Sequence, residues 1–103
     1  MDERLPKAQI ARLRERYVVR LATTADELVR LASASPGTDV DAEIVHLIHR
    51  LRGSAASFGF PALSELATSV EDDWTGRGSH TALHSGARAL ATLIHHFSGR
   101  VAL

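Results

Sequence analysis

Apolar residues recur at steps of three and four along almost the whole of this 103-residue chain. Such spacing places them on one face of an α-helix, whereas a half-buried β-strand would alternate apolar and polar residues, and no sustained alternation occurs. A hydrophobic fraction of 45% is enough for one core. We therefore expect an all-α fold: a single domain over residues 1–103, built as an antiparallel up-down four-helix bundle, with or without a short extra N-terminal helical segment.

Three interruptions divide this pattern into four predicted helices. Residues 35–37, Ser-Pro-Gly, end a first helix over about 7–34, because proline disfavours a helical conformation in the residue before it. Thr38 or Asp39 can cap a second helix over about 40–58. Gly59 suits a left-handed helix end, and Pro61 suits the first turn of a third helix. Residues 75–78 separate that helix from a fourth, which Ser79 can cap and which ends near Gly99.

The residues predicted to face the core share the helical spacing within each segment. They are Ile10, Leu13, Tyr17, Leu21, Ala25, Leu28 and Leu31 in the first helix; Ile44, Ile48, Leu51, Ala55 and Phe58 in the second; Leu63, Leu66, Ala67, Val70 and Trp74 in the third; and Leu83, Ala87, Leu90, Ile94 and Phe97 in the fourth.

Charge and cysteine content narrow the classes of partner. Twelve basic residues balance twelve acidic ones, so no overall field draws the chain to nucleic acid or to an anionic membrane, and another protein is the expected partner. Without cysteine there is no disulfide scaffold or thiolate metal site. The N-terminus lacks a secretory pattern, and no apolar run approaches the roughly 20 residues that cross a bilayer. We expect a cytoplasmic protein.

His49 is predicted to face away from the core of the second helix. Each helical residue turns about 100°, so His49 lies about 100° from the core residue Ile48. With Ile48 set at 0° around the helix axis, His46, Gly53 and Ala56 share the outer face at about +160°, +140° and +80°. Arg52 lies nearer the core boundary at about +40°. This places one imidazole on a surface of small side chains beside a cation.

Gly53 stands inside a predicted helix, where glycine costs roughly 0.5–1 kcal/mol relative to alanine. No turn or kink requires it there. Two explanations stay open from the sequence. The missing side chain lets a partner's backbone approach the imidazole, or it lets another helix of the bundle pack closely.

The segment that follows His49 resembles the signature of histidine-containing phosphotransfer (HPt) domains. An acceptor histidine is followed by leucine two residues on, a basic residue three on, glycine four on, small residues, glycine ten on and leucine fourteen on. The likeness extends to an apolar residue followed by glutamate. In this chain the corresponding residues are His49, Leu51, Arg52, Gly53, Gly59, Leu63, Val70 and Glu71.

The resemblance implies a role for several of these residues. His49 is the phosphorylated residue, Leu51 a core anchor, Arg52 the cation beside the phosphoryl group and Gly53 the gap that admits the partner. The family most often has lysine where this chain has Arg52, so charge is kept while a planar fork replaces a point charge. The surface predicted to dock the partner comprises His46, Arg50, Gly53, Ala56 and Ser57.

The implied function is phosphotransfer in a two-component phosphorelay. His49 would accept a phosphoryl group from a phospho-aspartyl receiver domain or a sensor or hybrid histidine kinase, and pass it to a response-regulator aspartate. A neutral imidazole can attack such a group without a strong base. The chain has no phosphate loop, nucleotide motif or paired-carboxylate magnesium site close to His49. We expect a phosphocarrier, not an enzyme, with no cofactor or metal of its own, and with magnesium on the receiver.

Two alternatives use the same fold. The chain could be a binding module that sequesters a receiver or kinase without being phosphorylated, although His49 and Gly53 would then have no reason to occur together. It could also be the phosphoacceptor part of a larger kinase, although the initial methionine and the lack of a linker favour a free-standing chain.

The remaining histidines and aromatic residues have structural interpretations. The pairs at 46 and 49 and at 80 and 84 have spacings that suit two metal ligands, but two ligands do not make a site, and we expect solvated surface residues there. His95 and His96 point about 100° apart and are also expected at the surface. Trp74 and Phe97 fit the core. A basic run at positions 12, 14, 16 and 20 is best interpreted as a solvated helix face.

Overall fold

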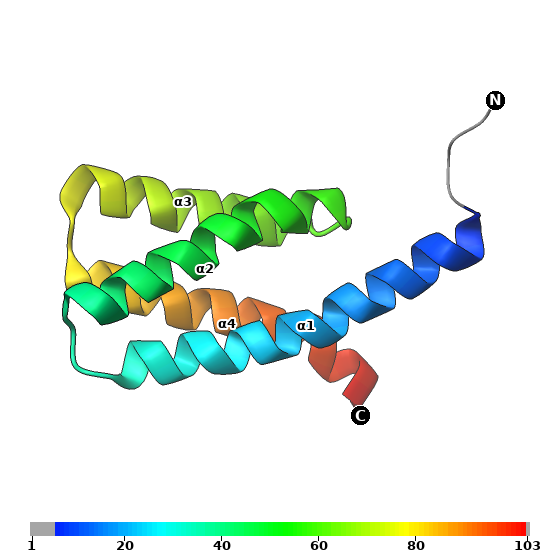
Figure 1. Ribbon diagram of the computed structural model, residues 1–103, viewed down its shortest axis with the longest axis horizontal. Helices are drawn as coiled ribbons and strands as arrows, with labels where there is room; N and C mark the ends of the chain where they lie inside the picture. Colours follow the sequence, from blue (N-terminus) through cyan, green and yellow to red (C-terminus); the bar gives the residue numbers. More distant parts are fainter. Residues whose placement is uncertain (1–5, 103) are drawn as a thin grey trace.

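The computed structural model describes residues 6–102, with side chains up to residue 97, as four antiparallel helices (Figure 1). Helices α1 and α4 pack most extensively on each other, and α2 and α3 form a second antiparallel pair. The predicted all-α bundle is confirmed, while the suggested extra N-terminal segment falls on residues 1–5, outside those described. The helices are α1 (Lys7–Ser33), α2 (Thr38–Ser57), α3 (Pro61–Arg77) and α4 (His80–Ala102).

The break between α1 and α2 lies where proline and glycine predicted it. Helix α2 begins at Thr38, directly after Gly37, and no side chain caps its first turn. The prediction of a cap at Thr38 or Asp39 is therefore wrong. Asp39 and Asp41 instead lie within the first turn, where acidic groups interact favourably with the positive end of the helix dipole.

A tight corner joins α2 to α3, as Gly59 and Pro61 predicted. Gly59 has a φ of 85°, in the left-handed region that favours glycine. The Phe60 N–H donates to the Ala55 carbonyl over 2.8 Å, which closes the end of α2. Pro61 is the first residue of α3, where its missing N–H costs nothing.

The boundary between α3 and α4 differs slightly from the prediction. Helix α3 continues through residues 75–77 and ends at Arg77, and Gly78 follows it as a left-handed cap with a φ of 64°. Ser79 caps α4 as predicted, because its Oγ accepts a hydrogen bond from the Ala82 N–H at 3.2 Å. Helix α4 runs to Ala102, past the end predicted near Gly99.

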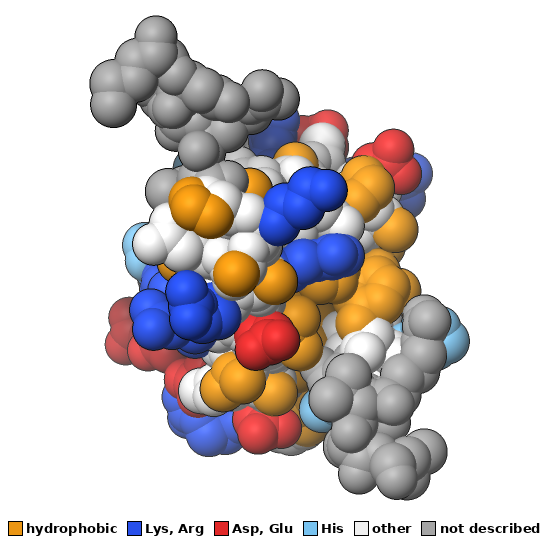
Figure 2. All heavy atoms as spheres, turned by 90° about the vertical axis from the view of Figure 1, so that its right-hand side faces the viewer, with side chains coloured by type: hydrophobic (Ala, Val, Ile, Leu, Met, Phe, Trp, Pro, Cys, Tyr) orange, Lys and Arg blue, Asp and Glu red, His pale blue; other side chains and the backbone are white. Residues whose placement is uncertain are grey.

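The core comprises the predicted stripes, with one correction at the start of α1. Ile10 and Leu13 are 49% and 39% exposed. They lie on a stretch of α1 that projects beyond the other helices (Figure 1), where they line a hollow with Ser57, Phe58 and Gly59 at the end of α2. The end view shows hydrophobic and basic side chains interspersed at this end of the molecule (Figure 2). Phe58, Trp74 and Phe97 are partly buried against the core.

Gly86 allows α3 and α4 to pack closely. A Cβ at this position would lie 2.5 Å and 2.8 Å from the two methyl carbons of Val70. Such distances are far shorter than van der Waals contact, so the missing side chain sets the spacing of these helices.

Among the residues described, no helix combines the length and apolar content needed to cross a membrane.

Candidate functional site

His49 lies on the outward face of α2 with 70% of its side chain exposed. Its Nδ1 is 2.8 Å from Oε2 of Glu71, which reaches across from α3. The helical wheel thus predicted the direction of His49 correctly, and the fold adds a carboxylate partner from 22 residues further along the chain.

Glu71 is held from both sides and is only 14% exposed. Its other oxygen, Oε1, accepts a hydrogen bond from Nη1 of Arg52 at 2.8 Å. The hydrogen bond from Arg52 is the main reason that the pKa of Glu71 lies below its ordinary value, since it outweighs the opposing effect of burial, and His49 adds to it. Glu71 is therefore an ionised acceptor at neutral pH.

This contact selects one tautomer of the neutral imidazole. A carboxylate can only accept, so Nδ1 of His49 must carry the ring proton and donate it to Glu71. The lone pair then resides on Nε2, which does not contact Glu71. A histidine held in this way has a fixed ring orientation and one nitrogen with a lone pair that can act as a nucleophile.

A groove of about 600 Å³ extends from His49 toward the N-terminus of α2. Val45 and Trp74 supply apolar surface, and His46 lies in the same wall as His49. The full lining is Thr38, Asp41, Ala42, Val45, His46, His49, Glu71, Trp74 and His80. The predicted docking residue His46 is thus beside the candidate acceptor.

The surface at Gly53 is open. A Cβ built there has no neighbouring atom within 4 Å, so the alternative of close helix packing is wrong for this glycine. Ala56 and Ser57 are also exposed and continue the low surface along α2. Arg50 is exposed too, but it lines a separate recess between α1 and α2.

A family model, the Hpt domain, matches residues 12–99, which include all the residues of this site. The chain belongs to the Hpt domain family. Hpt domains are phosphocarriers that work with receiver domains and kinases, so the chain takes part in a two-component phosphorelay. Comparison with curated proteins and with solved structures gives no match.

The prediction of solvated surface residues is confirmed for His80, whose side chain is 56% exposed, and is wrong for His84. His84 is 6% exposed, and its Nε2 lies 2.8 Å from Oδ1 of the buried Asp41. His80 bonds the other carboxylate oxygen through Nδ1. Burial opposes the ionisation of Asp41, but the hydrogen bonds from His84 and His80 outweigh it and hold its pKa below the ordinary value.

This cluster joins three helices of the Hpt domain. Nδ1 of His84 lies 3.1 Å from the carbonyl of Ala32 in the last turn of α1. Both ring nitrogens thus face acceptors, and both hydrogen bonds form together only when the ring carries two protons. Within the described residues, no group of three or more His, Asp or Glu side chains has an arrangement suited to a metal ion.

Glu71 is the site residue to which sequence reasoning gave no role. It stood in the family-like segment, directly after the apolar Val70, but its contact with His49 depends on how α2 and α3 pack. Arg52, predicted beside the phosphoryl group, is linked to His49 through this shared carboxylate.

Proposed function

We propose that His49 is the phosphoacceptor of this Hpt domain and that it reacts through Nε2. The observation that carries this proposal is the hydrogen bond between Nδ1 of His49 and Glu71, which leaves Nε2 as the nucleophilic nitrogen on an exposed side chain. The phosphoryl donor is either a receiver domain that carries an aspartyl phosphate or a histidine kinase. The acceptor is a response-regulator aspartate.

In the accepting step, the lone pair of Nε2 attacks phosphorus. A nitrogen–phosphorus bond forms as the bond between phosphorus and the aspartyl oxygen breaks, and the aspartate leaves as a carboxylate. The ring keeps its Nδ1 proton and gains positive charge, which Glu71 offsets across 2.8 Å. The reverse sequence transfers the group to the next aspartate and restores the neutral ring.

Arg52 contributes in two ways under this proposal. Its guanidinium orients Glu71 and keeps it ionised. It is also a cation close to the position of an incoming phosphoryl group, as the family resemblance implies. The receiver would supply the acidic pocket, magnesium and the reacting aspartate, so this chain is a carrier without catalytic machinery of its own.

Docking is proposed to use the groove beside His49 and the low surface that follows it. The groove brings His46 and His49 together with the apolar side chains of Val45 and Trp74. Beyond them, the open space over Gly53 leaves room for a partner's backbone.

The test is transfer from a receiver domain that its kinase has phosphorylated with radioactive phosphate. The expected product is acid-labile and alkali-stable phosphate on this chain. His49→Gln should abolish labelling with unchanged helical content. His46→Gln is the matched control, an exposed histidine one turn away that should still be labelled.

Labelled His49→Gln protein would overturn the site assignment, and loss of label only in His46→Gln would move the site to His46. The alternative function, a module that sequesters a receiver or kinase, predicts a stable complex with the receiver and no label on any variant.

A further inference from the structure

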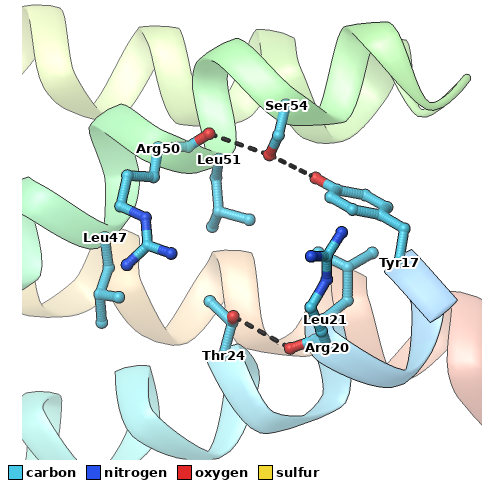
Figure 3. A pocket seen from close by; sticks show the side chains of 8 residues that line it. All are labelled: Tyr17, Arg20, Leu21, Thr24, Leu47, Arg50, Leu51 and Ser54. Carbon is cyan, nitrogen blue, oxygen red and sulfur yellow. Dashed lines mark hydrogen bonds between the residues drawn. The ribbon is translucent and has the colours of Figure 1, made fainter.

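A recess of about 330 Å³ lies between α1 and α2, separate from the groove at His49 (Figure 3). The α1–α2 seam is less extensively packed than α1–α4 or α2–α3, which leaves this space between the two helices. The volume is at the lower end of the range of small-molecule sites. The lining residues are Tyr17, Arg20, Leu21, Thr24, Leu47, Arg50, Leu51 and Ser54.

Two guanidinium groups enter this recess from opposite helices. Arg20 extends from α1 and Arg50 from α2, with Leu51 between them (Figure 3). Among the residues that the structure describes, neither forms an ion pair with a carboxylate; Arg20 lies over the ring of Tyr17, with 5.8 Å from its Cζ to the ring centroid. Two cations that face one space repel each other unless an anion lies between them.

The hydroxyl groups of the recess do not compete for such an anion. Ser54 donates to the Arg50 carbonyl at 2.9 Å, so Tyr17, 2.7 Å from the Ser54 oxygen, must donate to it. Thr24 donates to the Arg20 carbonyl at 3.0 Å. Each hydroxyl proton is thus already used, and the donors that remain are the guanidinium N–H groups.

The base of the recess is apolar. Leu21 and Leu51 are core residues, and Leu47 is partly buried beside them. A small apolar group that covers these side chains would remove leucine surface from water, which favours binding. The site therefore combines two guanidinium groups, which can bind an anionic group, with a leucine surface, which can bind an apolar group of the same ligand.

We propose that this recess binds a small organic anion, a phosphate ester or carboxylate with a compact apolar body, between Arg20 and Arg50. This site is independent of the proposed phosphotransfer, because His49 and Glu71 do not line it. A bound anion would bridge α1 and α2 across their less extensive contact and would stabilise the bundle by binding the folded state alone.

The experiment titrates the whole chain with phenyl phosphate at low salt, followed by calorimetry and by the amide NMR signals of α1 and α2. We expect saturable binding, with the largest shifts at the residues of the recess. Inorganic phosphate, which lacks the apolar body, and benzyl alcohol, which lacks the charge, should each bind more weakly. Added salt should weaken phenyl phosphate binding, because the guanidinium groups are exposed.

Two variants test the assignment of the cations. Arg20→Gln and Arg50→Gln should each weaken phenyl phosphate binding about tenfold, as expected for one charge-assisted hydrogen-bond partner. Arg16→Gln is the matched control, because Arg16 is an exposed arginine of α1 outside the recess, and it should leave the affinity unchanged. His49→Gln should bind like the parent, which separates this site from the phosphoacceptor.

Absence of binding, or binding that neither variant weakens, would overturn the proposal. So would a slower phosphotransfer in both variants without any binding of phenyl phosphate, because the two arginines would then serve to dock an acidic protein surface. A melting curve for each variant shows whether it is folded, as the exposure of both side chains predicts.

Discussion

Adding one methyl group at two glycines of this Hpt domain should give stability changes of opposite sign. At Gly86, the new Cβ would lie 2.5 Å and 2.8 Å from the methyl carbons of Val70. Valine in a helix strongly prefers a single rotamer, so Val70 cannot turn away freely. Overpacking of this kind costs about 1–3 kcal/mol, and improved helix propensity returns up to about 1 kcal/mol.

The expected outcome for Gly86→Ala is a net loss of roughly 1–2 kcal/mol, which lowers the melting temperature of a domain this size by several degrees. At Gly53 an added Cβ has no neighbour within 4 Å. Only the propensity gain and the reduced freedom of the unfolded chain remain, so Gly53→Ala should stabilise by up to about 1 kcal/mol.

Urea unfolding of both variants measures these differences. Introducing Gly86→Ala into a Val70→Ala protein isolates the cause of the loss at Gly86. In Val70→Ala, the two methyl groups that meet the new Cβ are gone. Gly86→Ala should then cost much less than in the parent, which is a coupling between the two positions. If Gly86→Ala is as stable as the parent, or if the effects of the two changes simply add, the close packing of α3 on α4 at this point is refuted.

The other predictions concern the site and its supports. Gly53→Val should slow phosphotransfer from a receiver while the domain stays folded, and an unchanged rate would mean that Gly53 does not serve access. Glu71→Gln should slow acceptance about fivefold, because the charge-assisted contact with His49 becomes a neutral one worth about 1 kcal/mol less; a parental initial rate would contradict this. Leu51→Ala, which truncates a side chain only 4% exposed, should cost about 2–5 kcal/mol in urea unfolding, and parental stability would show that the core face of α2 is misassigned. Asp41→Asn should cost about 3 kcal/mol near pH 7 by breaking a buried pair. The pKa of Asp41 is lower in the folded protein, so Asp41 adds stability above its unfolded pKa of about 3.9, and this stability is lost as the pH falls through the folded pKa. The free energy of unfolding of Asp41→Asn should therefore fall less steeply with acid than that of the parent. An equal dependence on pH would count against the contact.

Features set by neighbouring residues could be predicted from the sequence. The helix breaks follow from proline and glycine, and the direction of His49 follows from the 100° turn per residue. The same rule failed at Ile10 and Leu13, because helical spacing shows which residues share a face but not whether another helix reaches it. In the structure α1 extends past the other helices there.

Features set by packing could not be predicted. Glu71 meets His49 only because α2 and α3 lie side by side, and Asp41 meets His84 across 43 positions of sequence. His84 was expected at the surface because its carboxylate partner lies on a different helix, which no local spacing reveals. Gly86 looked like an ordinary helical glycine for the same reason, because its neighbour Val70 belongs to α3.

The extensive packing of α1 on α4 has a consequence for how the chain folds as it is made. The first helix and the last helix cover each other, so a nascent chain that lacks α4 leaves the buried face of α1 open to water. The corner at Gly59 lets α2 and α3 meet early through nearby residues, while closure of the core waits until α4 has been made. Premature termination within α4 would therefore expose apolar surface on α1, which is made earlier.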